Sequence, residues 1–339
     1  MAKSKRTRSV LFYKRVIGVT LIVVILGLAV ACGVLGARLG RTDEALAQAQ
    51  GELDRRNLEE AEKRAAEEAE RLRNAIPPER VKPAGERSAQ EILDECPAIV
   101  HALGAIDGVS GLNCLEGFLM HYNSGARVFE VDIRLTADGK PVLRHDWIGG
   151  LQDGVDTTSI PTLDEFRSKP ILDKYTPLSF RDLLLLMAEY PDICIITDTK
   201  FTDAETVTMQ FNAMLDDAHA LGMSYLFDRM IVQVYSPDHF TVVDGLHHFP
   251  FYIYTLYQDY FGRTEDSFRN KCVFCQENGI MGLTLNAELW DADFLPISNW
   301  RSINVYLHTI NDADEGRRLL RTGVRAVYSD TLDPADLME

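Results

Sequence analysis

The sequence predicts an α/β fold, specifically a (β/α)₈ TIM barrel, and three observations favour it. From about Ser88 onward, short β-rich runs alternate with amphipathic helical stretches. Eight such runs can be distinguished. They extend over about 250 residues, the usual size of such a barrel. A doubly wound parallel sheet produces a similar alternation, so the pattern favours the barrel without excluding that sheet.

The β-rich runs predict strands at residues 98–103, 127–135, 193–199, 230–235, 251–256, 282–285, 304–308 and 326–328. Helices are expected at residues 180–189, 204–221, 267–278 and 313–321. Ser179 precedes the first of these helices, where its hydroxyl can accept a hydrogen bond from the backbone N–H of Asp182. Gly222 and Gly279 stand where two helices should stop, because glycine readily adopts the left-handed conformation that ends a helix.

An apolar run near the N-terminus predicts a transmembrane anchor. Residues 17–36 contain no charged side chain, and about 20 apolar residues suffice to cross a bilayer as a helix. A buried core helix is disfavoured, because the run is apolar on all sides and follows six basic residues within residues 1–16. A cleaved signal peptide usually has a shorter apolar core of about 7–15 residues, and lipid attachment at Cys32 is a further alternative. The positive-inside rule places residues 1–16 in the cytoplasm and the rest outside, on a single-pass protein of the cell membrane.

The segment after the anchor predicts a helical stalk at residues 37–76. It is rich in Ala, Glu and Arg, which favour helices, and opposite charges recur four residues apart, where they can pair. Its apolar positions are mostly Ala and drift out of heptad register, so a coiled coil and self-association through the stalk stay open. Pro77 and Pro78 end the helix, residues 77–87 form a linker, and residues 88–339 form the globular domain.

The charge distribution excludes one class of partner. The chain carries a net charge of −16, and because residues 1–16 are basic, the remainder is even more acidic. Nucleic-acid binding needs a basic surface that releases condensed counterions, so no nucleic-acid partner is expected.

The cysteines give no clear metal site. Of the six cysteines, Cys272 and Cys275 form a C-x-x-C pair. A zinc site of this type needs a second pair, so a local disulfide or two free thiols are favoured.

Acidic residues on two predicted strands indicate a cation site. Glu130 and Asp132 are two positions apart, so their carboxylates point to the same face of the strand, which we expect to be the barrel interior. Two like charges there are unfavourable unless a cation or a proton neutralises them. Asp198 at the end of the next strand can supply a third oxygen ligand, and Lys200 a positive charge for a phosphate. The structural alternatives are an exposed edge strand for the first pair and a simple Asp–Lys ion pair for the second.

Two histidines near strand ends complete the candidate site. His101 lies within the first predicted strand, and His145 ends a hairpin-like stretch. Because histidine titrates near neutral pH, one neutral and one protonated ring can act as base and acid. The carboxylate oxygens suit Mg²⁺ or Ca²⁺ rather than zinc, and such an ion can neutralise a phosphodiester.

These segments resemble the glycerophosphodiester phosphodiesterase family. The residues that match its most specific block lie within residues 128–146 and are Glu130, Asp132, Thr136, Asp138, Gly139, Pro141, Val142, His145 and Asp146. Weaker resemblances lie at Asn113, Glu116 and Phe118 and, further along the chain, at Gln233, His308, Asp312, Gly323, Ser329 and Asp330. The resemblance covers residues from about 98 to 332, essentially the whole globular domain. It implies a (β/α)₈ barrel.

The resemblance also implies roles for individual residues. These are metal ligation by Glu130, Asp132 and Asp198, acid–base catalysis by His101 and His145, and phosphate contact from Lys200. In this family a neighbouring hydroxyl of the substrate usually attacks phosphorus, and the resulting cyclic phosphate is then hydrolysed. The expected function is therefore hydrolysis of a glycerophosphodiester to glycerol phosphate and an alcohol, with one Mg²⁺ or Ca²⁺ as cofactor.

Two other functions stay open. A phospholipase C- or D-like enzyme that acts on a phospholipid head group or a wall polymer would suit a membrane anchor, and a spider-venom-type phospholipase D group shares the His pair and the Asp-x-Lys. A catalytically silent barrel could instead bind a phosphoglycan. Such a barrel would need the carboxylates and a cation but no acid and base, so His101 and His145 argue against it.

Three departures from the family pattern concern the substrate. Ala102 follows His101 where the family has an arginine that binds phosphate, and Arg134 or Arg144 is a candidate to replace that charge. Asp198 is one methylene shorter than the usual Glu. His308 stands where the family often has Trp.

Overall fold

The computed structural model describes residues 55–56, 87–147, 159–259 and 262–338. Glu79–Leu215 and Tyr225–Glu339 belong to one compact unit, which contains the strands discussed below. The expected cytoplasmic tail, membrane anchor and stalk at residues 1–76 fall outside the described residues, apart from residues 55 and 56. In the part of the chain that is described, no helix combines the length and the apolar character needed to cross a membrane.

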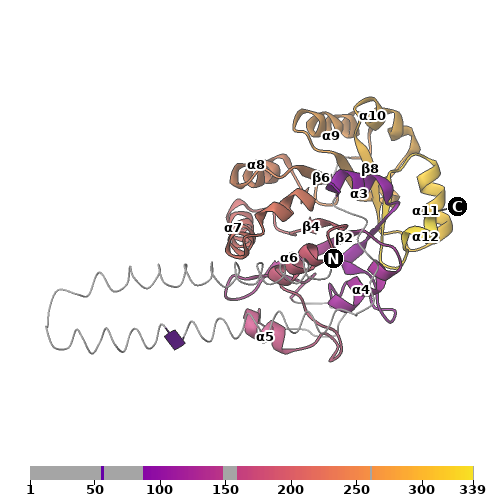
Figure 1. Ribbon diagram of the computed structural model, residues 1–339. Coiled ribbons are helices and arrows are strands. Elements are labelled where there is room, and N and C mark those ends of the chain that lie inside the picture. The colour runs from indigo at the N-terminus through magenta and orange to yellow at the C-terminus, as the bar shows by residue number, and fades with distance from the viewer. Residues whose placement is uncertain (1–54, 57–86, 148–158, 260–261, 339) are drawn as a thin grey trace, which may run out of the picture. The chain divides into compact units, whose positions relative to one another are not determined.

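Eight parallel strands close into a barrel (Figure 1). In barrel order they are β1 (Ala98–Val100), β2 (Val128–Leu135), β4 (Cys194–Asp198), β5 (Met230–Val234), β6 (Phe251–Thr255), β7 (Gly282–Asn286), β8 (Asn304–His308) and β9 (Ala326–Ser329). The barrel closes because β1 pairs in parallel with both β2 and β9. The short strand β3 (Pro141–Leu143) forms an antiparallel hairpin with the end of β2. This closed sheet confirms the predicted (β/α)₈ barrel and rules out the doubly wound alternative.

Helices surround the strands (Figure 1). They are α3 (Ala89–Glu95), α4 (Leu115–Asn123), α5 (Leu163–Ser168), α6 (Phe180–Glu189), α7 (Ala204–Leu221), α8 (Pro237–Leu246), α9 (Glu265–Glu277), α10 (Leu295–Trp300), α11 (Ala313–Arg321) and α12 (Pro334–Leu337). The predicted bounds of α6, α7 and α11 are confirmed, whereas α9 begins two residues earlier than predicted, after the cap residue Thr264. Short 3₁₀ turns occur at His101–Leu103, Ser224–Arg229, Ala287–Leu289 and Ala292–Phe294.

Local sequence signals set the ends of several helices. Before α6, the Ser179 hydroxyl accepts a hydrogen bond from Asp182 N, and the Asp182 carboxylate accepts one from Ser179 N at 2.8 Å. This reciprocal cap satisfies backbone groups that a helix start otherwise leaves free, and it confirms the predicted cap. Gly222 and Gly279 follow α7 and α9 with φ of +65° and +67°, the left-handed conformation that ends a helix.

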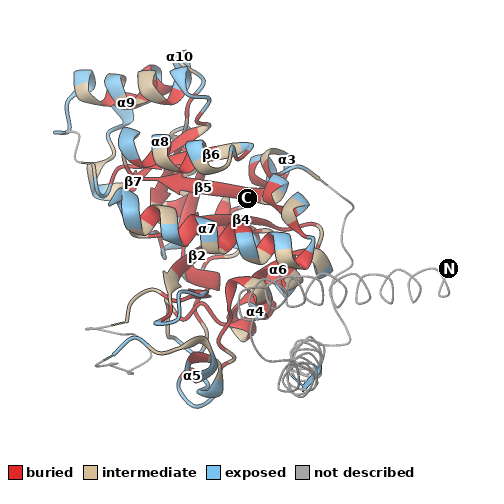
Figure 2. Ribbon diagram, turned by 90° about the vertical axis from the view of Figure 1, so that its left-hand side faces the viewer, coloured by how far each residue is buried: buried red, intermediate tan, exposed pale blue. Residues whose placement is uncertain are grey.

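The strands are buried on both faces (Figure 2). Parallel strands in such barrels pack against side chains inside and helices outside, which explains why strand β4 reads as a nearly continuous apolar run. Buried side chains from several strands form a core cluster that includes Ile99, Ile196, Ile231, Ile253 and Tyr306. Helices show exposed residues on their outer faces (Figure 2). A rigid, filled barrel therefore supports the polar residues at the strand ends.

The first strand is shorter than predicted. It ends at Val100, and His101–Leu103 form a 3₁₀ turn in which Ala102 and Leu103 have positive φ. The cause is a long-range contact, because the backbone N–H of Ala102 donates to Glu130 Oε2 at 2.8 Å. His101 therefore lies just beyond the strand rather than within it.

The described cysteines are all reduced. Cys96, Cys114, Cys194, Cys272 and Cys275 are buried free thiols. Of the two alternatives for Cys272 and Cys275, free thiols are therefore what the structure shows, and both lie in α9.

Candidate active site

The predicted site residues come from strands that lie side by side in the barrel. Asp132, the fifth residue of β2, is the register partner of Asp198 at the end of β4. Because neighbouring strands keep their pleats in phase, the two carboxylates share one face, and Glu130 shares it two positions earlier. His308 ends strand β8, which pairs with neither β2 nor β4. The site thus occupies the carboxyl-terminal ends of the strands, where barrel enzymes place their functional groups.

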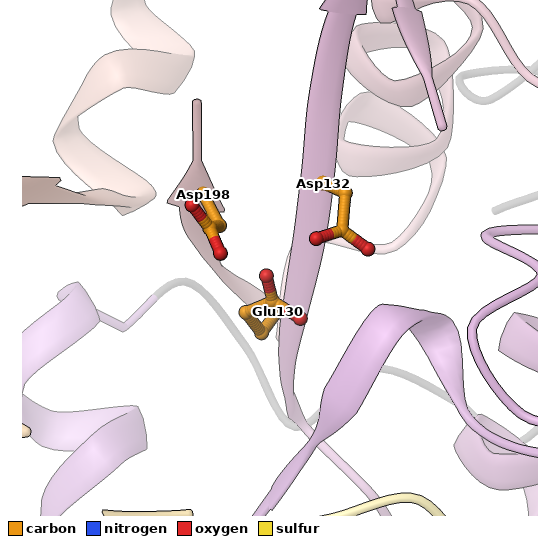
Figure 3. Close-up of side chains that lie close together, drawn as sticks. All are labelled: Glu130, Asp132 and Asp198. Carbon is orange, nitrogen blue, oxygen red and sulfur yellow. The ribbon is translucent and has the colours of Figure 1, made fainter. Parts of the chain in front are cut away.

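Three carboxylates converge as predicted. Glu130, Asp132 and Asp198 can each offer an oxygen such that all three oxygens lie within 4.8 Å of one another (Figure 3). All three side chains are buried. Burial and the neighbouring Asp132 carboxylate raise the pKa of Glu130 to about 8. Glu130 Oε1 is buried without a hydrogen-bond partner among the described residues. A divalent cation would satisfy this oxygen and offset the like charges, so the residues present fit such an ion.

Asp132 is held by an amide on a neighbouring loop. Asn113 Nδ2 donates to Asp132 Oδ2 at 2.8 Å, and Asn113 Oδ1 accepts from Asp132 N at 3.0 Å. Burial alone would raise the pKa of Asp132, but the Lys200 ammonium and the nearby histidines outweigh it and lower the pKa to about 2. Asp132 is therefore ionised and fixed in orientation. In the sequence, Asn113 was noted only through the family resemblance, and its two hydrogen bonds to Asp132 were not predicted.

Lys200 pairs with two of the three carboxylates. Its Nζ lies 2.7 Å from Asp132 Oδ1 and 2.6 Å from Asp198 Oδ2. Burial disfavours the charged amine, but the surrounding carboxylates outweigh burial and raise the pKa of Lys200. The Asp–Lys ion pair, which was the structural alternative for this segment, is therefore present. A phosphate contact from Lys200 stays a prediction.

Two tyrosines that the sequence did not single out support Asp198. The Tyr235 hydroxyl donates to Asp198 Oδ1, and the Tyr257 hydroxyl lies 3.0 Å from the same oxygen. Both follow strand ends, directly after β5 and two positions after β6. Their place just after a strand could have marked both tyrosines as candidate site residues in the sequence. It does not show which carboxylate each phenol hydroxyl contacts.

His101 is oriented by a carboxylate from the last strand. Its Nδ1 lies 2.8 Å from Asp330 Oδ1, and its Nε2 lies 3.7 Å from Glu130 Oε2. Asn311 in turn donates to Asp330 Oδ2 at 2.8 Å. Burial would lower the pKa of His101, but the Glu130 and Asp330 carboxylates outweigh it and raise the pKa to about 9. The sequence gave Asp330 no role, because it lies 229 positions away along the chain.

His145 lies at the edge of this group. Its Nδ1 is 2.6 Å from Asp146 Oδ2, and Arg134 binds both Asp146 Oδ1 at 2.6 Å and the His145 carbonyl at 2.9 Å. About a third of the His145 side chain is exposed, at 35%. His145 is not among the residues that line the cavity, yet it is near enough to contribute to the lowered pKa of Asp132.

A cavity of about 200 Å³ lies at this end of the barrel. Its lining consists of His101, Glu130, Asp198, Lys200, Gln233, Thr255, Tyr257, His308 and Tyr328. Lys200 is the only lysine or arginine among the described residues of this lining. Arg134 and Arg144, the candidates for the charge missing after His101, instead bind Asp146 through its carboxylate and its carbonyl.

The closed parallel barrel thus brings three buried carboxylates and His101 together at one end of its strands. The Glycerophosphoryl diester phosphodiesterase family model matches residues 110–334. The chain belongs to this family and is a phosphoric diester hydrolase.

Solved structures show the same fold. A protein from Silicibacter pomeroyi, assigned as a glycerophosphoryl diester phosphodiesterase, is 19% identical with a TM-score of 0.59, over 74% of this chain and 96% of that one. A phosphodiesterase from Oleispira antarctica, solved with the product sn-glycerol-3-phosphate, is 16% identical with a TM-score of 0.56, over 74% of this chain and 98% of that one. No curated protein matches the chain. At these identities the structural likeness establishes the fold alone.

Proposed function

We propose that this phosphodiesterase hydrolyses glycerophosphodiesters to glycerol phosphate and an alcohol, and that it depends on one Mg²⁺ or Ca²⁺. The observation that carries the proposal is the buried group of three carboxylates. One of its oxygens, Glu130 Oε1, has no hydrogen-bond partner in the described chain, and the cavity beside it is lined by His101 and Lys200. Family membership supports the same reaction.

The donor set favours a hard cation. Glu130, Asp132 and Asp198 offer only carboxylate oxygens, which Mg²⁺ and Ca²⁺ prefer over the nitrogen and sulfur ligands typical of zinc. These three residues would hold the ion, which when bound supplies electrostatic stabilisation of the charge on the phosphodiester. Lys200, the cationic residue of the lining, adds a fixed positive charge for a phosphate oxygen.

The two histidines serve as base and acid. Asp330 holds Nδ1 of His101, and Asp146 holds Nδ1 of His145. In each ring this leaves Nε2 as the atom that can accept or release a proton, because a carboxylate at Nδ1 selects the tautomer that keeps the proton there. One ring takes the proton of the attacking hydroxyl, and the other protonates the leaving alcohol.

The place of action is a further part of the proposal. Residues 17–36 and the basic residues before them favour a membrane anchor with the barrel outside the cytoplasm. That position supports a second candidate, a phospholipase-like enzyme that cuts intact lipid head groups or a wall polymer. Turnover of glycerophosphodiesters compared with that of intact phospholipids distinguishes these two candidate functions.

The test is turnover by the full-length chain of a panel of glycerophosphodiesters and intact phospholipids, with added Mg²⁺ or Ca²⁺ and with chelator. We expect glycerol phosphate from the glycerophosphodiesters only when a cation is present. Cleavage of intact lipids alone would replace the leading function by the phospholipase one. Cleavage of no diester under either ion would contradict both.

A variant pair tests the His assignment in the same assay. His145→Ala should lower kcat by about 100-fold or more, because it removes a proton-transfer group. His248→Ala is the matched control, since this exposed histidine contacts Asp244 and Tyr252 and is not part of the cavity lining. Equal activity of both variants would remove His145 from the mechanism.

A further inference from the structure

His308 is a lining residue to which neither the family resemblance nor the proposed mechanism gives a role. It ends strand β8 and lines the cavity. Its Nε2 is buried, and none of the described residues hydrogen-bonds to it. A buried polar atom without a partner is unfavourable, and native structures usually satisfy such atoms with protein, water or ligand. The cavity beside His308 is where a partner can reach it.

Packing rather than hydrogen bonding fixes the imidazole. The ring of Tyr257 lies 6.1 Å from it between centroids at 88°, and the ring of Tyr328 lies 6.2 Å away at 82°. Both arrangements are edge-to-face, which is a favoured geometry for aromatic rings. These two contacts favour the orientation that the imidazole has in the cavity wall.

The cavity lining divides into two chemical sets. The charged set, defined as His101, Glu130, Asp198 and Lys200, can bind a cation and a phosphate. The neutral set, defined as Gln233, Thr255, Tyr257, His308 and Tyr328, contains polar groups that both donate and accept hydrogen bonds. Within the neutral set, Thr255 Oγ1 is also buried without a partner among the described residues.

His308 belongs to the neutral set on electrostatic grounds as well. Burial and the nearby charge of His101 lower the pKa of His308 to about 4. The ring is therefore uncharged at neutral pH, with one nitrogen as donor and the other as acceptor. A neutral donor–acceptor group does not compensate the charge of a phosphate, but it matches a hydroxyl, which also donates and accepts.

We propose that His308 determines specificity by hydrogen bonding, through Nε2, to the hydroxyl of the substrate's glycerol part that lies farther from the phosphate. This inference rests on the proposed diesterase function. A substrate without that hydroxyl would leave both His308 Nε2 and Thr255 Oγ1 unpartnered among the described residues.

The test compares two diesters that differ in one hydroxyl. The first is a glycerophosphodiester, and the second is its analogue built on 1,2-propanediol, which keeps the hydroxyl beside the phosphoester and lacks the far one. We expect the full-length wild-type chain to prefer the first by about 10- to 100-fold in kcat/KM, because the analogue leaves a buried polar group unpaired. His308→Gln, which keeps a neutral donor and acceptor, should retain most of this preference, whereas His308→Leu should reduce the ratio to about one.

Product binding separates this inference from the diesterase function. Glycerol 3-phosphate and 1,2-propanediol phosphate are titrated into the full-length wild type and both variants by calorimetry, with no turnover required. A preference for glycerol 3-phosphate that the Leu variant loses and the Gln variant keeps supports the role of His308 even if no diester is cleaved. An equal ratio in the wild type and His308→Leu, in either assay, overturns it, as does a wild type with no preference. Unchanged melting temperatures of the variants show that folding is not the cause.

Discussion

At the scale of single residues, the site is a balance of buried charges that a cation would complete. Lys200 compensates Asp132 and Asp198, whereas Glu130 keeps one oxygen without a partner among the described residues. Burial and the neighbouring Asp132 carboxylate both disfavour the ionised form of Glu130, and its pKa is therefore raised. Glu130 is therefore the carboxylate at which a neutral side chain should be most favourable for stability, although it also removes one cation ligand.

Glu130→Gln should stabilise the cation-free protein while it weakens cation binding. The unfolded chain loses the Glu130 proton near its ordinary pKa of 4.5, but the folded chain keeps it until about pH 8. Wild-type stability therefore falls across this window, and the uncharged Gln removes that loss. In urea unfolding with chelator, the variant should gain on the wild type from pH 5 to pH 8, by on the order of 1–3 kcal/mol at the upper end. A constant difference across the window would contradict the buried charge.

Asp330→Asn should lower the pKa of His101. The Asp330 carboxylate is one of three, with Glu130 and Asp132, that raise this pKa to about 9, and the amide keeps its shape without its charge. Titration of the imidazole protons by NMR in chelator should show a fall of about 1 or more toward the ordinary value of 6.5. Asp314→Asn on the exposed face of α11 is the matched control and should leave His101 as it is. An unchanged pKa of His101 in Asp330→Asn would mean that Asp330 orients the ring but does not raise its pKa.

At the scale of elements, local sequence signals located the eight barrel strands and four of the described helices. The apolar alternation and the caps gave the bounds of α6, α7 and α11 because these signals depend on neighbours within a few residues. The predicted end of β1 was wrong, because the true end depends on a contact between residues far apart in the sequence. The chain turns at Ala102 toward a carboxylate 28 positions away, and no local pattern encodes that contact.

Ser179→Ala should destabilise the barrel through helix α6. The hydroxyl caps the helix and also accepts from Arg167 at 2.8 Å in a buried position. Loss of such a cap costs about 0.5–2 kcal/mol, and the buried setting places the expected value in the upper half. Ser168→Ala at the exposed end of α5 is the control, with an expected change within about 0.5 kcal/mol. Equal unfolding free energies for the two variants would show that the cap contributes little.

At the scale of the whole domain, contacts between distant segments hold the site, and these were beyond the sequence. The group of three carboxylates was predictable, because Glu130 and Asp132 share one face of a strand and Asp198 ends the next strand. Tyr235, Tyr257 and Asp330 were not assigned roles, because their partners are known only once strands from both halves of the chain meet. The membrane anchor and stalk at residues 17–76 stay predictions.

A second long-range pair links α4 to the segment after β9. His121 Nδ1 lies 2.8 Å from Asp333 Oδ1, and His121 Nε2 lies 3.1 Å from the Ala105 carbonyl. Burial would lower the pKa of His121, but Asp333 and this carbonyl outweigh it and raise the pKa above 6.5. The charged pair therefore stabilises the fold fully below about pH 6.5, and this contribution is lost as the pH rises through the folded pKa.

Asp333→Asn should show that pH dependence. Its cost in unfolding free energy should be greatest between pH 5 and 6.5, about 1–2 kcal/mol for a charge-assisted hydrogen bond, and should shrink at higher pH. Asp314→Asn again serves as the control. A cost that grows with pH would contradict a protonated His121.

Diester hydrolysis should depend on a cation that the three buried carboxylates hold. The most direct measurement is release of glycerol phosphate from a glycerophosphodiester by full-length wild type and Asp132→Asn, as Mg²⁺ or Ca²⁺ is added back after chelation. We expect saturable recovery in the wild type and in the control Asp314→Asn, and a loss of about 100-fold or more in Asp132→Asn at every ion concentration. Full wild-type activity in chelator, or equal recovery in Asp132→Asn, would contradict it.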